Sequence, residues 1–268
     1  MRSIPKIISG LDDIVPGSLD AISRLYRRTF DNVVPVSKPE VAEMTKLYEN
    51  CQRMMCIAYA NEMADACAPH GIDPYEVCDA AATKPFGYMP YMPGLGVGGH
   101  CIPVNPFYLL SNSSFPLLEA ASAAMWSRPA AVAERTLASL NKSDTPAEKP
   151  SKKLKGTRRV LVVGMAFKAG QSSLSNSPGL ELAKHLAVSR ETEVTWADTM
   201  VAQEAIPQLP RLPDCEWRKD VLGTFDLIVV ALRQHGMDFD LLDQLEDTQV
   251  DMWCHRPTRR AAYEPKAP

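Results

Sequence analysis

Long apolar runs and a charge excess of one sign are both missing from this sequence. No run reaches the roughly 18 apolar residues that a membrane-spanning helix needs. The segment at 1–6, MRSIPK, also lacks the apolar stretch of a secretory signal, so we expect a cytoplasmic protein with no membrane partner. The net charge is only −3, from 29 lysines and arginines against 32 aspartates and glutamates. This balance argues against a nucleic-acid partner.

The cysteines and histidines lack the spacing of a redox pair or a metal site. Seven cysteines include no C-x-x-C, and the five histidines have no metal-ligand spacing. An odd number of unpaired thiols is typical of a reducing compartment. We therefore predict free thiols and no metal.

What the sequence does have is globular composition, with 268 residues of which 46% are apolar and 23% charged. This length favours about two domains. The segment at 141–157, NKSDTPAEKPSKKLKGT, has two prolines, five lysines and almost no apolar residue. A solvated linker is favoured over a phosphate-binding or membrane-binding patch, so we place the main boundary there.

Before this linker the pattern is mostly helical. The run from Pro39 to Ala68 has no glycine and no internal proline, and Pro39 suits a first helical turn. Such a helix would extend roughly 45 Å, which favours packing against a partner helix or a second subunit. Short extended segments are expected at 5–10 and 33–36, and further helices near 18–26, 75–82, 115–126 and 129–140.

After the linker, apolar runs alternate with helical stretches. The run at 159–163, RVLVV, ends at a glycine and is typical of a buried parallel strand. Further strands are expected at 193–197, 225–231 and 250–253, with helices at 177–186 and 239–245. The fold class is therefore α/β overall, with an all-helical central domain followed by a Rossmann-like parallel α/β domain.

The segment at 94–106, GLGVGGHCIPVNP, is the most informative in the chain. It contains G-x-G-x-x-G, but no strand precedes it and no long helix follows, so it is a weak dinucleotide fingerprint. The better interpretation is a glycine-rich loop that lets backbone approach a ligand and presents Cys101. The alternative is that Cys101 is a small buried apolar residue, as lone cysteines usually are.

A second candidate set lies on the long helix. Lys46, Asn50 and Arg53 follow one another at i, i+4 and i+7, so they share a face. A lysine and an amide donor are suited to stabilise a developing oxyanion. The alternative is a polar face turned to water.

Together these segments resemble the UDP-glucose/GDP-mannose dehydrogenase family, the nucleotide-sugar dehydrogenases. The matching stretches are VAEMTKLYENCQRMMCIAYANE (41–62), GIDPYEVCDAAATKP (71–85), PGLGVGGHCIPVNPFYLL (93–110) and RVLVVGMAFKAGQSSLSNSPGLELAKHL (159–186). The form GVGGHCIP is more similar to the UDP-N-acetylmannosamine dehydrogenase branch than to the UDP-glucose enzymes.

The resemblance implies an oxidoreductase of polysaccharide biosynthesis that uses NAD to oxidise the C6 alcohol of a UDP-sugar to the uronic acid. It implies that Cys101 forms a thiohemiacetal and then a thioester, while Lys46 and Asn50 hold the oxyanion. The substrate would contact Gly94, Gly96, Gly98, Gly99, His100, Phe167 and Lys168. The implied assembly is a homodimer through the central domain.

The implied domains are the end of an N-terminal Rossmann domain at 1–36, a helical central domain at 37–140, the linker at 141–157, and a UDP-sugar-binding α/β domain at 158–268. Most of the NAD-binding domain is expected to be lacking, because the single Gly164 after a strand is no dinucleotide fingerprint. We therefore expect a truncated chain that does not reduce NAD by itself.

The chain also departs from the family pattern at several polar positions. Asn105 stands where the family has an aspartate that helps to activate water. Ser173 and Ser175 replace an aspartate and an arginine, and Ser122 and Met125 replace an arginine and an asparagine. Two alternatives to the enzyme follow: a degenerate, non-catalytic dimer that binds a nucleotide sugar or serves as a scaffold, and a Cys101 pocket reused for non-redox chemistry.

Overall fold

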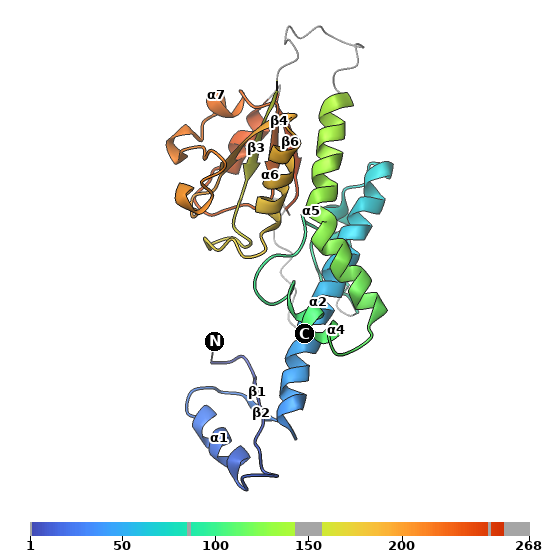
Figure 1. The fold of residues 1–268 in the computed structure, drawn as a ribbon, viewed down its shortest axis with the longest axis vertical. Coiled ribbons are helices and arrows are strands. Elements are labelled where there is room, and N and C mark those ends of the chain that lie inside the picture. Colours follow the sequence, from blue (N-terminus) through green and yellow to red (C-terminus); the bar gives the residue numbers. More distant parts are fainter. Residues whose placement is uncertain (1, 85–86, 143–156, 246–247, 255–268) are drawn as a thin grey trace.

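The computed structural model of the chain is elongated and describes residues 2–84, 87–142, 157–245 and 248–254, without the side chains of residues 141 and 142 (Figure 1). The linker expected at 141–157 falls almost entirely outside these residues. The N-terminal unit lies at one end of the long axis, and a C-terminal α/β unit lies beside a helical body toward the other end (Figure 1).

The N-terminal unit is one small β-α-β motif. Strands β1 (Lys6–Ile8) and β2 (Val33–Pro35) pair in parallel, and helix α1 (Ser18–Tyr26) connects them. Large apolar side chains stay exposed here, including Ile14 at 76% and Leu25 at 62%. Its strand β1 contacts the helix that follows, α2 (Pro39–Cys67).

The helical body is built on α2 (Pro39–Cys67), an unbroken helix as the sequence predicted, which ends at the short 3₁₀ turn η1 (Ala68–His70). Helices α3 (Pro74–Ala82) and α4 (Asn105–Leu110) follow, and α5 (Pro116–Lys142) packs against α2. The prediction of two helices at 115–126 and 129–140 is wrong, because α5 continues through Pro129. The helix survives the lost backbone hydrogen bond since it packs against α2 and against the C-terminal unit.

The C-terminal unit is a four-stranded parallel sheet in the order β4-β3-β5-β6, which confirms the predicted α/β class. The strands are β3 (Arg158–Val163), β4 (Thr192–Ala197), β5 (Leu227–Val230) and β6 (Gln249–Met252). The connections contain α6 (Pro178–Val188), η2 (Gln203–Ala205), η3 (Asp214–Glu216), α7 (Lys219–Leu222) and η4 (Phe239–Gln244). The helix predicted at 239–245 is the 3₁₀ segment η4.

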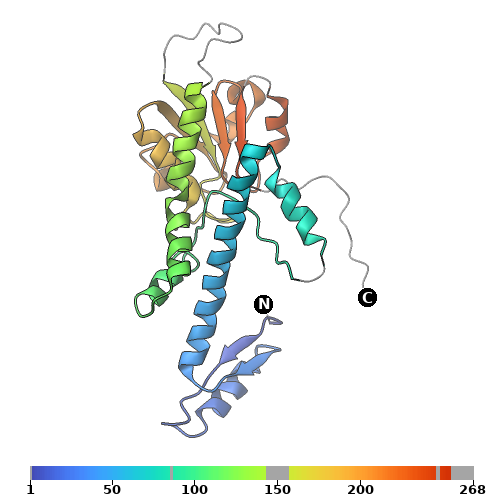
Figure 2. The same cartoon turned by 90° about the vertical axis from the view of Figure 1, so that its right-hand side faces the viewer.

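Each face of this sheet has its own apolar core. On one face, Val160 and Val162 pack with α6, with Val132 of α5 and with Leu95 of the glycine-rich loop. On the other face, Leu161 packs with residues of α7 and η4. Because α5 belongs to the helical body, the first core joins that body to the sheet, and α5 and α6 lie side by side (Figures 1 and 2).

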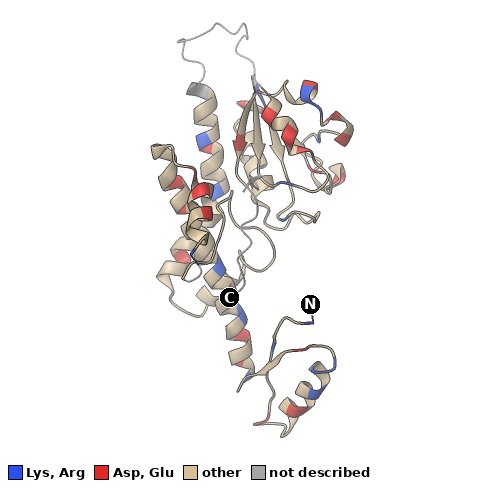
Figure 3. Cartoon of the chain, turned by 180° about the vertical axis from the view of Figure 1, so that it is seen from behind, with Lys and Arg blue, Asp and Glu red and all other residues tan. Residues whose placement is uncertain are grey.

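Over the described ranges, none of the helices is long and apolar enough to cross a bilayer. The same residues contain no cluster of three or more histidine, cysteine, aspartate or glutamate side chains that would suit a metal ion. Charged residues of both signs are interspersed over the helices and the C-terminal unit (Figure 3).

Candidate functional site

The glycine-rich loop starts from a fixed point on the helical body. The Gly94 N–H donates to Oδ1 of Asn61 on α2 at 2.7 Å, and its carbonyl accepts from Nε of Arg128 on α5 at 2.9 Å. Asn61 and Arg128 are both buried. Because neither side chain is solvated, each bond is costly to break. The loop therefore leaves the helices in one defined direction.

Three glycines then pass close under the C-terminal unit. A Cβ on Gly98 would lie 2.7 Å from Cβ of Phe167, and one on Gly99 would lie 3.0 Å from the Phe167 ring. Gly96 and Gly99 also have φ of +151° and +98°, which side chains other than hydrogen rarely allow. The close approach that Gly98 and Gly99 permit is thus to Phe167, a protein side chain.

This geometry predicts a sharp difference between two glycine-to-alanine substitutions. Gly98→Ala should destabilise the protein by about 1–3 kcal/mol, since the new methyl overlaps Phe167. Gly94→Ala is the matched control, because its Cβ would be 3.4 Å from the nearest carbonyl, an ordinary contact, and its φ is not left-handed. Urea unfolding of both variants measures the difference. Equal midpoints would contradict the packing described for Gly98.

Cys101 lies on the turn that leads from this loop into α4. Its carbonyl accepts from the N–H groups of Val104 at 3.1 Å and Asn105 at 2.8 Å, and its side chain is exposed. Two residues later, the Pro103 carbonyl accepts from the indole N–H of Trp126 at 3.3 Å. The thiol thus faces solvent from a backbone that is held on its C-terminal side.

The predicted residues on α2 divide into a buried member and an exposed one. Asn50 is 3% exposed and donates from Nδ2 to Oδ1 of Asn105, while its own Oδ1 accepts from Arg53 Nη1 at 2.7 Å. Lys46 is exposed and pairs with Glu49 at 3.2 Å. The structure therefore brings Asn50 to the cysteine loop, and it turns Lys46 to water.

The loop at 165–171, which carries Phe167 and Lys168, lies over the carboxyl end of the sheet. Phe167 is half-buried and packs edge-on to the His100 ring with centroids 6.3 Å apart, whereas Lys168 is exposed. Asp198, 1% exposed, accepts from the N–H groups of Met165 at 2.9 Å and Ala166 at 3.1 Å. Asp198 thus fixes the base of this loop.

Sequence reasoning missed Asp198 and its partner Gln234, which is 3% exposed and donates to the Asp198 carboxylate at 3.2 Å. A signal was present: Asp198 follows β4 directly, and Gln234 follows β5 by four residues. Strands β4 and β5 lie on either side of β3, and the carboxyl ends of these parallel strands share one edge of the sheet, which is where polar side chains support ligand loops.

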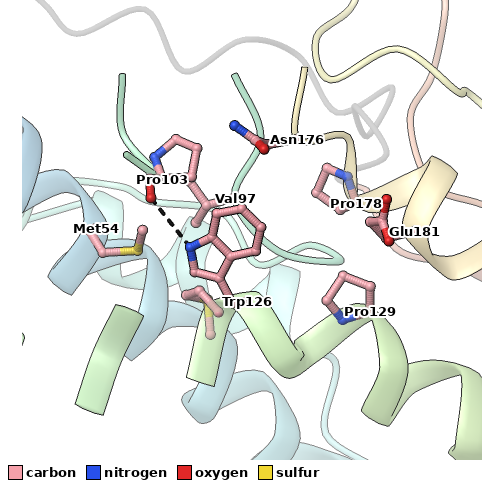
Figure 4. Close-up of a pocket in the computed structure, with 9 residues that line it drawn as sticks. Met54, Val97, Pro103, Trp126, Pro129, Asn176, Pro178 and Glu181 are labelled. Carbon is pink, nitrogen blue, oxygen red and sulfur yellow. Dashed lines mark hydrogen bonds between the residues drawn. The ribbon is translucent and has the colours of Figure 1, made fainter. Parts of the chain in front are cut away.

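A small pocket marks the seam between the helical body and the C-terminal unit (Figure 4). Trp126 lies at the centre of this view, with Met54 and Pro129 on either side and Asn176 above it. The volume open to water is about 60 Å³, enough for a few water molecules but not for a nucleotide sugar. The remaining lining residues come from α2, α5, α6 and the glycine loop: Met54, Val97, Pro103, Met125, Pro129, Pro178 and Glu181.

Two of the substituted family positions lie buried beside this seam. The Ser122 hydroxyl is fully buried and has no hydrogen-bond partner among the described residues. Met125 is buried, and its sulfur accepts from Nδ2 of Asn61 at 3.3 Å. Ser173 and Ser175, the other substituted pair, hydrogen-bond only weakly to one another, with hydroxyl oxygens 3.4 Å apart. The family pattern has an arginine here, and neither serine supplies its positive charge.

An ion-pair cluster that sequence reasoning also missed braces the start of the loop. Arg128 makes two bonds to the Asp65 carboxylate, at 2.8 and 3.1 Å, and Arg135 makes a third at 3.0 Å. Both guanidinium groups lie 5.7 Å from the Trp253 ring, which comes from the end of β6. Burial alone would raise the pKa of Asp65, but the hydrogen bonds and charges of the two arginines hold it below its ordinary value.

The residues present do not fit a dinucleotide. A pyrophosphate site needs a strand, a glycine-rich turn and a helix in sequence. In the described chain the G-x-G-x-x-G segment follows no strand, and Phe167 occupies the space beside Gly98 and Gly99. We therefore assign no residue described here to NAD.

Comparison with known proteins gives a consistent set of relatives. Residues 40–124 match the central domain of the UDP-glucose/GDP-mannose dehydrogenase family. A UDP-N-acetyl-D-mannosamine dehydrogenase of Pyrococcus horikoshii is 33% identical over 181 residues, 67% of this chain and 40% of the relative. The Escherichia coli K12 enzyme of the same name is 30% identical over 216 residues, 78% of this chain and 49% of the relative.

Solved structures agree. The structure of the UDP-N-acetylmannosamine dehydrogenase from Pyrococcus horikoshii superposes with a TM-score of 0.76 at 26% identity, covering 94% of this chain and 56% of that one. A UDP-glucose dehydrogenase from Pyrobaculum islandicum shares the fold, with a TM-score of 0.71 at 22% identity over 94% of this chain and 55% of that one.

This chain spans about half the length of the curated relatives that it matches. The matched family model covers α2, the glycine-rich loop and the first part of α5, which are the elements that place Asn50 beside the Cys101 turn. From the family model, the curated relatives and the shared fold together, the chain belongs to the UDP-glucose/GDP-mannose dehydrogenase family of nucleotide-sugar dehydrogenases.

Proposed function

We propose that this protein takes part in the oxidation of a UDP-sugar at its C6 alcohol, with Cys101 as the covalent nucleophile. The observation that carries the proposal is the hydrogen bond between Asn50 and Asn105, 55 residues apart, which docks the cysteine turn onto α2. Nucleophilic catalysis needs a reactive group and an oxyanion donor on one rigid frame. Asn50 supplies that frame because its side chain is buried and held by Arg53.

The step that these residues support is addition of the Cys101 thiolate to an aldehyde. A carbon–sulfur bond forms, the carbonyl electron pair moves to oxygen, and a proton then gives the thiohemiacetal. An asparagine amide has two N–H groups, and Asn50 uses one of them on Asn105. The second N–H and the Lys46 ammonium are the donors that we propose for the oxyanion. The exposed ammonium must leave Glu49 to reach it.

The later steps need two groups that the described residues do not supply. Oxidation of the thiohemiacetal needs a hydride acceptor, for which we propose NAD without assigning it a site in the described chain. Release of the acid needs an activated water, and the carboxamide of Asn105 is no base. A second candidate function therefore has an observation in its favour: a nucleotide-sugar-binding protein in which Asn50 and Asn105 form a static amide pair.

A comparison of two ligands separates these functions. A UDP-N-acetylmannosamine carrying a C6 aldehyde should protect Cys101 from iodoacetamide at least about tenfold more than the parent alcohol at equal concentration. Thiol addition requires no hydride acceptor, so the test is independent of NAD. Equal protection by both compounds would favour the binding protein. No protection by either would reject both functions.

We also propose a homodimer through α2, because this helix is too long for one small helical body to cover its whole surface. Tyr48 and Tyr59 on this helix are 71% and 65% exposed. Light scattering at micromolar concentration should give twice the monomer mass, and Tyr59→Asp should shift the equilibrium toward monomer because it places a charge in an apolar contact. Val188→Asp on α6, at a residue 79% exposed, is the control. A wild-type monomer would contradict the proposal.

A further inference from the structure

Asn176 connects the C-terminal unit to the loop that carries Cys101. Its Nδ2 donates to the Gly99 carbonyl at 2.9 Å, and the Gly99 N–H donates to the Ser175 carbonyl at 2.8 Å. Both polar groups of Gly99 are therefore held by two consecutive residues of one turn. Gly99 precedes Cys101 by only two positions, so this contact acts close to the thiol.

The turn that bears Asn176 is itself firmly fixed. The Ser177 hydroxyl accepts from the Leu180 N–H at 3.2 Å as the cap of α6, and it donates to the Met165 carbonyl at 2.6 Å. The Phe167 N–H donates to the Ser173 carbonyl at 3.0 Å. The turn is thus tied to the same loop that carries Phe167.

The backbone of Asn176 also has an unusual conformation. Its φ is +48°, in the left-handed region that asparagine tolerates better than most residues. The side chain reaches the Gly99 carbonyl, and it lines the same pocket as Trp126 (Figure 4). Asn176 therefore combines a backbone role that glycine would share with a side-chain bond that glycine lacks.

Cys101 lies between two anchors on different parts of the molecule. Before it, Gly99 is bound to the C-terminal unit through Asn176. After it, Pro103 is bound to Trp126 and Asn105 to Asn50, both on the helical body. Glycines at 98 and 99 have no side chains to restrain the backbone, so the position of the loop before Cys101 depends on the bonds between Gly99 and the turn at 175–176.

We propose that Asn176 is a positioning residue for Cys101: by holding the Gly99 carbonyl, it sets the thiol at a fixed place relative to the Phe167 loop. The proposal deepens the proposed function, on which it rests for the role of Cys101 as nucleophile. A nucleotide gripped by Phe167 and Lys168 would then reach a thiol at a constant distance. Asn176 itself forms no bond to the reacting atoms.

Two variants remove the bond and keep the turn. Asn176→Gly retains the left-handed backbone without the donor, and Asn176→Asp retains the shape but offers only acceptor oxygens to a carbonyl. Arg190→Gly is the matched control. Arg190 has φ of +59° and is exposed at the end of α6, so the substitution relieves the same backbone conformation away from the loop.

Fluorine NMR reads the position of the thiol without any substrate. Bromotrifluoroacetone labels Cys101 and Cys215, the two exposed cysteines, and Cys215 serves as the internal standard. Both Asn176 variants should shift the Cys101 resonance toward that of an unstructured thiol adduct. The Cys215 resonance should stay in place, and Arg190→Gly should change neither. Hydrogen exchange at the Gly99 amide should rise by about tenfold in the two variants alone.

Two results would overturn the proposal. In the first, the Cys101 resonance and the Gly99 exchange rate stay unchanged in both variants. In the second, exchange rises equally throughout the C-terminal unit and the melting temperature falls with it, which would give Asn176 a general role in stability only. The proposed function fails by a different readout, namely when the aldehyde ligand leaves wild-type Cys101 unprotected, so the two failures are distinguishable.

Discussion

Replacing Arg128 with alanine should lower the free energy of unfolding by about 2–3 kcal/mol. The substitution removes two bonds to Asp65 and the bond to the Gly94 carbonyl from a side chain that is 5% exposed. Loss of one partner of a fully buried pair costs about 3–5 kcal/mol, because the other charge stays uncompensated. The expected cost is smaller here, since Asp65 is 37% exposed and keeps Arg135.

Arg135→Ala is the control for this prediction. Arg135 binds the same carboxylate and faces the same Trp253 ring, but its side chain is 46% exposed. Exposed pairs contribute less than about 1 kcal/mol. Urea unfolding followed by circular dichroism would measure both variants. A cost for Arg128→Ala no larger than that for Arg135→Ala would show that the buried guanidinium does not brace the loop.

The difference between wild type and Arg128→Ala should depend on pH. The pKa of Asp65 is lowered in the folded protein, so the pair contributes stability above the ordinary value of 3.8, and this contribution is lost as pH falls through the lower folded value. A protonated Asp65 has no negative charge for Arg128 to compensate. The stability gap between the two proteins should therefore narrow on acidification toward the part that the Gly94 bond contributes, and a constant gap down to low pH would contradict this account.

Much of the fold was predictable because its strands and its long helix carry strong local signals. The residues at 160–163 are buried on both faces of the sheet, which is why they are continuously apolar. Helix α2 was bounded correctly because prolines and a glycine flank it. Pro129 gave the wrong prediction, since a local rule does not anticipate that α5 packs on both sides. Helix α4 has only six residues and gave no periodic signal.

The candidate site was predictable in its parts but not in its arrangement. The spacing of Lys46, Asn50 and Arg53 indicated one helix face, yet only the structure separates buried Asn50 from exposed Lys46. The glycines were interpreted as room for a ligand, whereas Gly98 and Gly99 make room for Phe167. Contacts between segments about 70 residues apart have no local signature, so sequence reasoning did not find them.

Cys101 should react with iodoacetamide faster than the other six cysteines at neutral pH, and Lys46→Ala should lower its rate by about threefold. Exposure limits the competition to Cys215, because Cys51, Cys67 and Cys78 are buried and the remaining two are half-buried. Burial also raises the pKa of Cys51, and it raises the pKa of Cys254 to about 11, so both stay as unreactive thiols.

The contrast between Cys101 and Cys215 therefore tests the site itself, since both thiols are exposed and only Cys101 lies on the turn that is docked to α2. An ammonium within reach of a thiol favours the reactive thiolate. We expect Lys46 to provide it, because its pair with Glu49 is exposed and such pairs are weak. Lys38→Ala, which removes another exposed lysine at the start of the same helix, is the control for net charge. Peptide-resolved labelling measures the rates at both cysteines. Equal rates at Cys101 and Cys215, or no change on removing Lys46, would mean that the loop presents an ordinary surface thiol. The binding-protein alternative would then account for the chain.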